Sequence, residues 1–182
     1  MNKPTGYDET QAFTGQFEEL APGGYICRIR RAREEMSRAG RPMLRVFFDI
    51  DEGERKGFYQ RTFDRQSGNY DNASWKGTYS QLTDGNSVAF FKGMITAIEE
   101  SNPGYTFNWD EETLKGRLFG GVFGREEYIG SDGKARMITK CLSIRSVAAV
   151  RAGIEPPKDK MLPSSPAPQD GFTPTNEKMP WE

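Results

Sequence analysis

The chain has 182 residues, of which 35% are hydrophobic and 12% aromatic, and its formal net charge is −1. This length predicts one domain, or one domain and a tail, and the aromatic rings can supply the volume of a small core. There is no histidine, and the two cysteines, Cys27 and Cys141, lie far apart, which excludes Ser-His-Asp and Cys-His catalysis, His-ligated metal sites and a Cys-x-x-Cys motif.

No stretch of the sequence approaches the roughly 18 apolar residues that a membrane-spanning helix needs. Residues 1–19 are polar and acidic, unlike the basic and apolar regions of a secretory signal peptide. We therefore expect a soluble, intracellular protein that makes no contact with a membrane.

Basic residues are concentrated in two blocks that the near-zero net charge conceals. Residues 25–65 and 117–151 each carry more basic than acidic side chains, whereas the segment between them, 66–116, is acidic. A local excess of positive charge steers polyanions toward a surface. The pattern favours binding to a nucleic acid, although ordinary surface charge would also produce it.

Two alternating segments in the first basic block predict a β-hairpin. Along 25–33, tyrosine, cysteine and isoleucine alternate with basic residues, and along 43–50 every second residue from Leu44 to Ile50 is apolar. The segment 37–40, with its glycine, is expected to form the connecting loop.

A third strand is expected at 58–65, because aromatic and basic residues alternate along it. The polar segment 66–84 is interpreted as a long loop that holds at most a short helix. A helix is predicted at 87–100, since its first residue is a serine suited to an N-cap and its apolar residues recur at helical spacing.

The second basic block predicts another pair of strands, at 116–129 and 136–144, joined by a tight turn at 131–134. The first of these strands contains Gly120, Gly121 and Gly124. Glycines inside a strand often mark a bulge or a tight bend of a barrel.

The expected order is three strands, one helix and two strands. This is the order of the OB-fold, a five-stranded Greek-key barrel with one helix between strands three and four; a two-layer α+β sheet is the main alternative. We predict a mainly β OB-fold domain at 19–154, preceded by an irregular arm at 1–18. The proline-rich segment 155–182 has few apolar residues and is expected to be a disordered tail.

Arginine and aromatic residues share the strand faces that we expect to be exposed. In an OB-fold the surface around strands two and three binds single-stranded nucleic acid, because arginines neutralise phosphates and aromatic rings stack on bases. Some of the aromatic residues on these strands could instead belong to the core. The candidate DNA-binding residues are Arg28, Arg30, Arg45, Phe47, Tyr59, Arg61 and Phe63, then Trp75 and Lys76 on the following loop, and Arg117, Arg125, Tyr128, Arg136 and Lys140 in the second block.

The segment 49–54 holds four acidic residues that could bind Mg²⁺ for nuclease chemistry, or Ca²⁺. The calcium-loop pattern fails, since Gly53 occupies a ligand position and Glu54 stands where glycine is needed. No phosphate-binding loop or dinucleotide fingerprint is present either. We interpret the segment as a solvated turn, and expect no metal, no cofactor and no enzymatic activity; a metal-dependent nuclease is the alternative.

Met179, Pro180 and Trp181 resemble the tip of bacterial single-stranded-DNA-binding proteins, which docks repair and replication enzymes. The likeness has two departures: Glu182 follows the aromatic residue, and the acidic run before the tip is reduced to Glu177. The resemblance implies that the tail recruits such enzymes as partners.

A wider likeness covers roughly residues 17–163. The chain resembles a family of small phage and mobile-element proteins that are regarded as OB-fold single-stranded-DNA-binding proteins. The family implies this fold and a role in replication or recombination within a bacterial host cell, but it identifies no binding residues. The motifs that carry the likeness are the segments 17–25, 37–44, 114–117, 125–128, 131–134, 146–153 and 156–158.

The sequence thus predicts a non-catalytic protein that binds single-stranded DNA with little sequence preference, in the cytoplasm of a bacterial host. The alternative is an OB-like module that binds a protein, such as a recombinase or a virion component, through the same arginine–aromatic surface. The choice between DNA and RNA and the oligomeric state stay open, and a homo-oligomer is compatible with the sequence.

Overall fold

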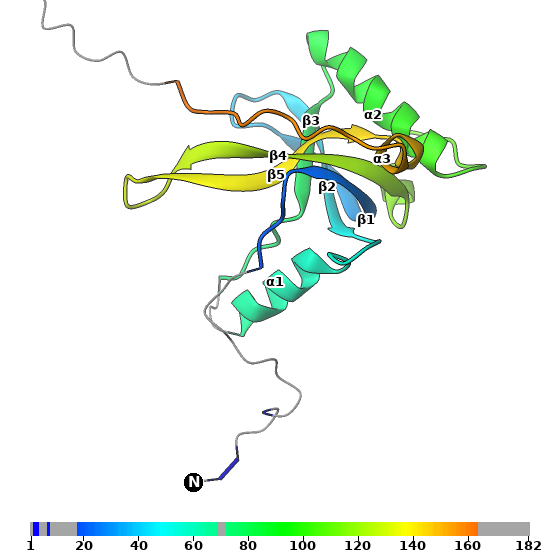
Figure 1. Ribbon diagram of the computed structural model, residues 1–182. Coiled ribbons are helices and arrows are strands. Elements are labelled where there is room, and N and C mark those ends of the chain that lie inside the picture. The colour runs from blue at the N-terminus through cyan, green and yellow to red at the C-terminus, as the bar shows by residue number, and fades with distance from the viewer. Residues whose placement is uncertain (1, 4–6, 8–17, 69–71, 164–182) are drawn as a thin grey trace, which may run out of the picture.

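A computed structural model of the protein describes residues 2, 3, 7, 18–68 and 72–163. Within these residues, five antiparallel strands form one sheet accompanied by a few helices, so the protein is mainly β as predicted (Figure 1). No helix in this part of the chain has the length and apolar character to cross a lipid bilayer. The elements are β1 (Gly23–Met36), β2 (Pro42–Ile50), α1 (Phe58–Ser67), β3 (Thr78–Leu82), α2 (Val88–Ser101), β4 (Leu118–Ile129), β5 (Ala135–Arg145) and α3 (Val147–Arg151), with short 3-10 turns at Gly85–Ser87 and Glu111–Leu114.

The strands follow the order β3-β2-β1-β4-β5, which places β1 at the centre and β3 and β5 at the edges. Strands are present close to 25–33, 43–50, 116–129 and 136–144, and a helix close to 87–100, as the sequence predicts. In Figure 1, α2 and α3 lie at one end of the sheet and the β4–β5 hairpin extends away from them.

The prediction of a strand at 58–65 is wrong, because these residues form the helix α1. The third strand of the sheet is instead β3, which lies in the segment interpreted as a loop and pairs with β2 from Met43–Leu82 to Phe47–Thr78. One helix was expected between the third and fourth strands, and α2 lies there; α1 is an additional helix between β2 and β3.

The helix α1 forms because a distant carboxylate satisfies its first N–H groups. Asp49, at the end of β2, is 4% exposed, and its side-chain oxygens accept hydrogen bonds from the main-chain N–H groups of Tyr59 at 2.9 Å and Gln60 at 3.1 Å. An acidic side chain at a helix N-terminus is favourable, because unpaired N–H groups point toward it. Gly57, with φ of 71°, makes the turn into the helix.

The core lies between the sheet and α2 and is rich in aromatic rings. Phe48 of β2 meets Phe119 and Phe123 of β4 edge to face, with ring centres 5.3 and 6.0 Å apart. These two strands are separated by β1, so the sheet must curve for the rings to meet. Met94 and Ile98 of α2 are buried in the same cluster, as their helical spacing predicts.

The glycines of β4 allow other segments to pack directly on the strand. A Cβ atom at Gly120 would lie 2.4 Å from Val150 of α3, and one at Gly124 would lie 3.0 Å from Pro157. Contacts closer than about 3.4 Å are unfavourable for carbon atoms. The strand also carries a register shift against β5 between Val122 and Phe123, in line with the expectation of a bulge.

Residues 155–163, which the sequence analysis assigns to a disordered tail, lie along the outer part of β4. Lys160 donates its main-chain N–H to Arg125 and accepts that of Glu127, both at 2.9 Å, in a parallel bridge. This part of the strand lies beyond the point where β1 stops pairing with β4 at Phe123. The rest of the predicted tail, 164–182, lies outside the described residues, as does most of the predicted arm at 1–18.

Candidate nucleic-acid interface

Arginine and aromatic side chains meet on the outer face of β1 and β2, and the Trp75 ring at one end of this surface also packs against the core. We call this surface the arginine–aromatic band. Its arginines keep 36–49% of their side-chain surface exposed, so they can reach a ligand. The band consists of Arg30 and Arg33 of β1, Arg45 and Phe47 of β2, Phe63 of α1, and Trp75 on the segment before β3.

Trp75 is held at one end of the band. Its indole N–H donates to the main-chain carbonyls of Phe48 and Gly77, at 3.1 Å each. The Arg30 guanidinium lies 5.3 Å from the Trp75 ring centre, and the Phe63 ring lies 5.8 Å away at 48°. A cation within about 6 Å of a ring is attracted to its face. Trp75 therefore has a fixed position and remains partly exposed.

Arg30 reaches Trp75 because of an irregularity in β1. The register against β2 shifts between Ile29 and Arg31, so Arg30 is the additional residue of a bulge. Its guanidinium also donates to Asp49 at 3.2 Å, which fixes its direction.

The other end of the band is a pair of arginines that share one carboxylate. Arg33 and Arg45 lie opposite each other on β1 and β2. Glu35 is in contact with the Arg33 guanidinium and lies 3.1 Å from that of Arg45. Arg33 also lies 5.1 Å from the Phe47 ring centre, and Arg45 donates to Ser80 of β3 at 3.1 Å. Two guanidinium groups that converge on one carboxylate resemble the arrangement in which arginines bind a phosphate.

Three of the sequence candidates at 58–65 have positions other than those predicted. Tyr59 is 5% exposed in the core, so its assignment to an exposed strand face with Arg61 and Phe63 is wrong. Burial raises the pKa of Tyr59 far above its ordinary value. Arg61 is directed to Glu18, at 3.0 Å, away from the band. Of the three, only Phe63 joins the band, through Trp75.

The candidates of the second basic block lie on β4 and β5 or beside them, and their contacts are with residues outside the band. Arg117 covers the Tyr105 ring at 4.1 Å, Arg125 pairs with Asp159 at 2.7 Å, and Arg136 pairs with Asp132 at 2.8 Å. Lys140 contacts Glu126, and Tyr128 is 41% exposed. Within 18–68 and 72–163, no hydrogen bond, ion pair or ring contact joins these residues to the band.

Arg28 and Lys76 flank the band. Arg28 makes a two-pronged ion pair with Asp51, with both N–O distances at 2.8 Å, and donates to the carbonyl of Gly116 at 2.9 Å. Lys76 follows Trp75 directly and is exposed. The predicted docking tip of Met179, Pro180 and Trp181 lies outside the described residues.

The acidic segment 49–54 is divided among separate structural contacts. Asp49 binds the start of α1, Asp51 pairs with Arg28, and Glu52 pairs with Arg151 at 3.0 Å. Among the residues that the structure describes, no three His, Cys, Asp or Glu side chains are grouped so as to hold a metal ion. The absence of enzymatic activity stays a prediction.

The two cysteine thiols are buried and have the properties of core side chains. Burial raises the pKa of Cys141 to about 12, and it raises that of Cys27 well above its ordinary value. A thiol is a nucleophile only as its thiolate, and burial disfavours the thiolate of both groups, as in core side chains.

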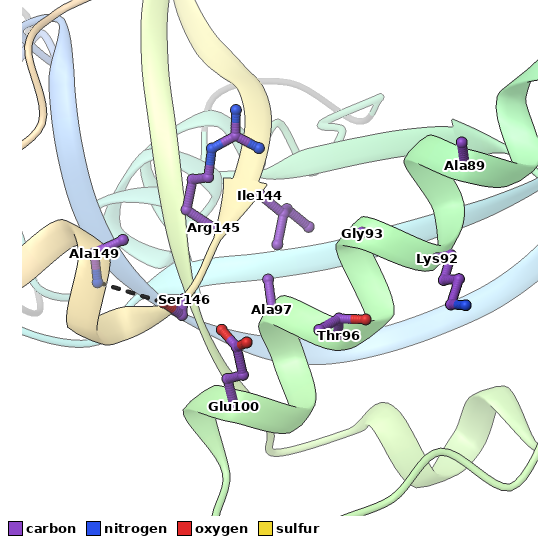
Figure 2. Close-up of a pocket in the computed structure, with 10 residues that line it drawn as sticks. All are labelled: Ala89, Lys92, Gly93, Thr96, Ala97, Glu100, Ile144, Arg145, Ser146 and Ala149. Carbon is purple, nitrogen blue, oxygen red and sulfur yellow. Dashed lines mark hydrogen bonds between the residues drawn. The ribbon is translucent and has the colours of Figure 1, made fainter.

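A hollow of about 490 Å³ lies between α2 and the junction of β5 with α3 (Figure 2). The α2 side presents the small residues Ala89, Gly93 and Ala97. Ser146 accepts the main-chain N–H of Ala149 at 3.4 Å and so begins α3. Within the described residues, no hydrogen bond joins the hydroxyls of Thr96 and Ser146 to Lys92 or Glu100, so we assign the hollow no chemistry.

Sequence reasoning missed Arg33 and Glu35, because both lie beyond the bulge at Arg30. After the bulge, the residues that strict alternation assigns to the core face lie on the outer face. A prediction based on strict alternation therefore places them on the wrong side of β1. Counting residues back along both strands from the loop at 37–40 pairs Arg33 with Arg45. This count would have identified Arg33 and Glu35 as residues of the outer face.

The amino-acid sequence matches no protein-family model and no curated protein.

Proposed function

We propose that the protein binds single-stranded DNA, with little sequence preference, through the arginine–aromatic band. The observation that carries this proposal is the alternation of exposed guanidinium groups with partly exposed rings from Arg45 and Phe47 to Arg30 and Trp75. Unpaired bases stack on aromatic rings whatever their identity, and arginines bind the phosphates between them. Such a surface would bind a single strand without recognising its base sequence.

We further propose that the sheet is the barrel of an OB-fold. The order β3-β2-β1-β4-β5 becomes this barrel when its two edge strands join, and Cα atoms of β3 and β5 lie within 8 Å of each other. The helix α2 lies between the third and fourth strands, as the fold requires. An experimental structure with β3 and β5 hydrogen-bonded would support this proposal, and a solvated gap between them would contradict it.

The proposed setting is the replication or recombination of a phage or mobile element in the bacterial cytoplasm, as the family resemblance implies. In this setting the protein would cover exposed single strands of DNA. The segment that contains Met179, Pro180 and Trp181 would bind replication or recombination enzymes. Removal of residues 177–182 should then abolish capture of such enzymes and leave strand binding unchanged.

The direct test is fluorescence anisotropy of a labelled oligo-dT against protein concentration, at two salt concentrations. Duplex DNA and single-stranded RNA serve as competitors. We expect binding that weakens steeply with salt, because phosphate contacts release counterions, and that duplex DNA fails to displace. Absence of binding at low salt would contradict the proposed function.

A protein-interaction module is the second candidate, and the β4–β5 hairpin favours it. Near its tip, Ile129, Met137 and Ile138 are 57%, 40% and 45% exposed. Ile129 and Met137 share one face of the hairpin and Ile138 lies on the other, as the β4–β5 register shows. Exposed apolar residues close together are typical of protein interfaces. A partner or a second copy that stays bound after nuclease treatment, and that Ile129→Asp releases, would support this candidate.

A further inference from the structure

A hollow of about 440 Å³ adjoins the arginine–aromatic band at Arg30. We call it the basic groove. It lies between β1, the segment from Ile50 to Gly57, and the turn before β4. Arg30 belongs to both surfaces, because it contacts Trp75 in the band and also lines the groove. The cationic residues of the groove are Arg28, Arg30, Lys56 and Lys115.

The positive charge of the groove is only partly neutralised. Its two carboxylates belong to Asp49, which binds the start of α1 and Arg30, and to Asp51, which pairs with Arg28. Lys56 and Lys115 are exposed, and the described part of the chain places neither ammonium in an ion pair. Lys56 lines the groove together with Asp51. The hydrogen bond and charge of Arg28, and then the charge of Lys56, lower the pKa of Asp51.

Two turns hold the lysines at the rim of the groove. Gly57 and Gly116 have φ values of 71° and 82°, in the left-handed region that favours glycine. A Cβ atom at Gly116 would meet nothing within 4 Å, so this turn faces open space. The Gly116 carbonyl accepts from Arg28 at 2.9 Å, which holds the turn against β1.

The lining of the groove contains no aromatic side chain. It therefore offers no surface on which a base can stack, in contrast to the band. Lysine ammonium groups bind phosphate as point charges, without the planar matching that guanidinium groups require. The chemistry of the groove suits the backbone of a nucleic acid rather than its bases.

We propose that the basic groove binds backbone phosphates of the same single strand whose bases lie on the band, with Lys56 and Lys115 as phosphate-binding residues. This inference rests on the proposed function. The strand would pass from the Trp75 ring across Arg30 into the groove, so the binding site would extend beyond the band toward the turn before β4.

The test is the double variant Lys56→Gln/Lys115→Gln, compared with the wild type in anisotropy titrations of labelled oligo-dT over a salt series. We expect roughly tenfold weaker binding near physiological salt, and a salt dependence whose log–log slope is smaller by about 1.4, since each phosphate contact on a single strand contributes about 0.7. The matched control is Lys92→Gln/Lys158→Gln, which removes two exposed lysines elsewhere and should change neither quantity.

Oligonucleotide length provides a second measurement. Strands that cover only the band should bind the wild type and the double variant equally, whereas longer strands should bind the wild type more tightly. Equal affinity at all lengths, with an unchanged salt slope, would overturn the proposal for the groove. If Phe47→Ala still weakens binding in that case, the proposed function stands without the groove.

Nuclear magnetic resonance of the labelled protein separates a strand phosphate from a free anion. We expect oligo-dT to shift the amide signals of Gly57 and Gly116, and inorganic phosphate to shift them only at much higher concentration. Saturable shifts with inorganic phosphate and none with oligo-dT would identify a site for a small anion and overturn the proposal. If the wild type binds no strand in the anisotropy test, the proposed function fails, and the phosphate titration alone shows whether the groove binds an anion.

Discussion

Trp75 donates its indole N–H to the main-chain carbonyl of Phe48 at 3.1 Å, while the Phe48 side chain packs against Phe119 in the core. One residue of β2 thus connects the core to the candidate interface. The position of the partly exposed indole depends on a strand that is buried on its other face. A binding surface supported in this way is rigid, and a rigid ring loses little conformational entropy when a base stacks on it.

Replacement of the band rings should weaken strand binding. Phe47→Ala and Trp75→Ala each remove a stacking surface worth about 1–3 kcal/mol per base, so we expect roughly 5- to 150-fold weaker affinity for oligo-dT. Anisotropy titration measures this change, and thermal unfolding shows whether the variant is folded. Trp109→Ala is the control, because Trp109 is 82% exposed but lies outside the band. Equal losses in all three variants would contradict the location of the site.

Glu35→Gln should strengthen strand binding. The carboxylate occupies Arg33 and Arg45, and its removal frees two guanidinium groups for phosphate. We expect affinity for oligo-dT to rise roughly three- to tenfold at low salt and less at high salt, where exposed charges are screened. Glu34→Gln makes the same charge change at the neighbouring position and should have a much smaller effect. Weaker binding by Glu35→Gln would show that the carboxylate orients the arginines instead.

The ion pair of Asp51 with Arg28 should make stability depend on acid pH. The hydrogen bond from Arg28 lowers the pKa of Asp51 from its ordinary value of 3.8. The folded state therefore holds the proton more weakly than the unfolded state, and the contribution of the pair is fully present above pH 3.8 and lost as the pH falls through the lower folded value. Urea unfolding of wild type and Asp51→Asn should differ at pH 6 and converge toward pH 3. Asp132→Asn removes a more exposed pair and should show little of this dependence.

Two glycine substitutions should change stability in opposite directions. A Cβ atom at Gly77 would lie 2.3 Å from the Phe48 carbonyl oxygen and 2.8 Å from the Tyr59 ring, so Gly77→Ala should destabilise the fold by roughly 1–3 kcal/mol or more. Gly93 lies inside α2, where a Cβ atom meets nothing within 4 Å. Gly93→Ala should therefore stabilise by roughly 0.5–1 kcal/mol, because alanine favours helix. Urea unfolding measures both, and a stable Gly77→Ala would contradict the close packing of Gly77 against Phe48 and Tyr59.

The sequence predicted those elements whose stability depends on their own side-chain pattern. The strand at 43–50 and the helix at 87–100 have regular apolar faces, and both are present. The helix α1 was missed because its first N–H groups are satisfied by Asp49, which lies on β2 and precedes Tyr59 by 10 residues. The strand β3 has no buried residue, and it forms through pairing with β2, which its own polar sequence does not indicate.

In the candidate site, too, the residues that a strand's own pattern indicates were predicted, and those that depend on distant contacts were not. Arg45 and Phe47 lie on the outer face of β2, which the alternation along this strand identifies. Trp75 meets this surface from the segment before β3, through Arg30. Tyr59 lies in the core because α1 replaces the expected strand. Lys56 and Lys115 are not among the predicted binding residues, since only the fold brings the two turns together beside Arg28. Contacts between residues distant in sequence decided each of these differences.

The segment along β4 also protects an exposed strand edge. Lys160 satisfies the main-chain N–H of Glu127 and the carbonyl of Arg125, where β1 no longer covers the strand. A chain shortened to end at Ala152 would leave these groups open to pairing with a neighbouring molecule, and unprotected edges of this kind promote aggregation. The residues after α3 therefore contribute to colloidal solubility, and a shortened version for crystallisation or labelling should retain them through Leu162.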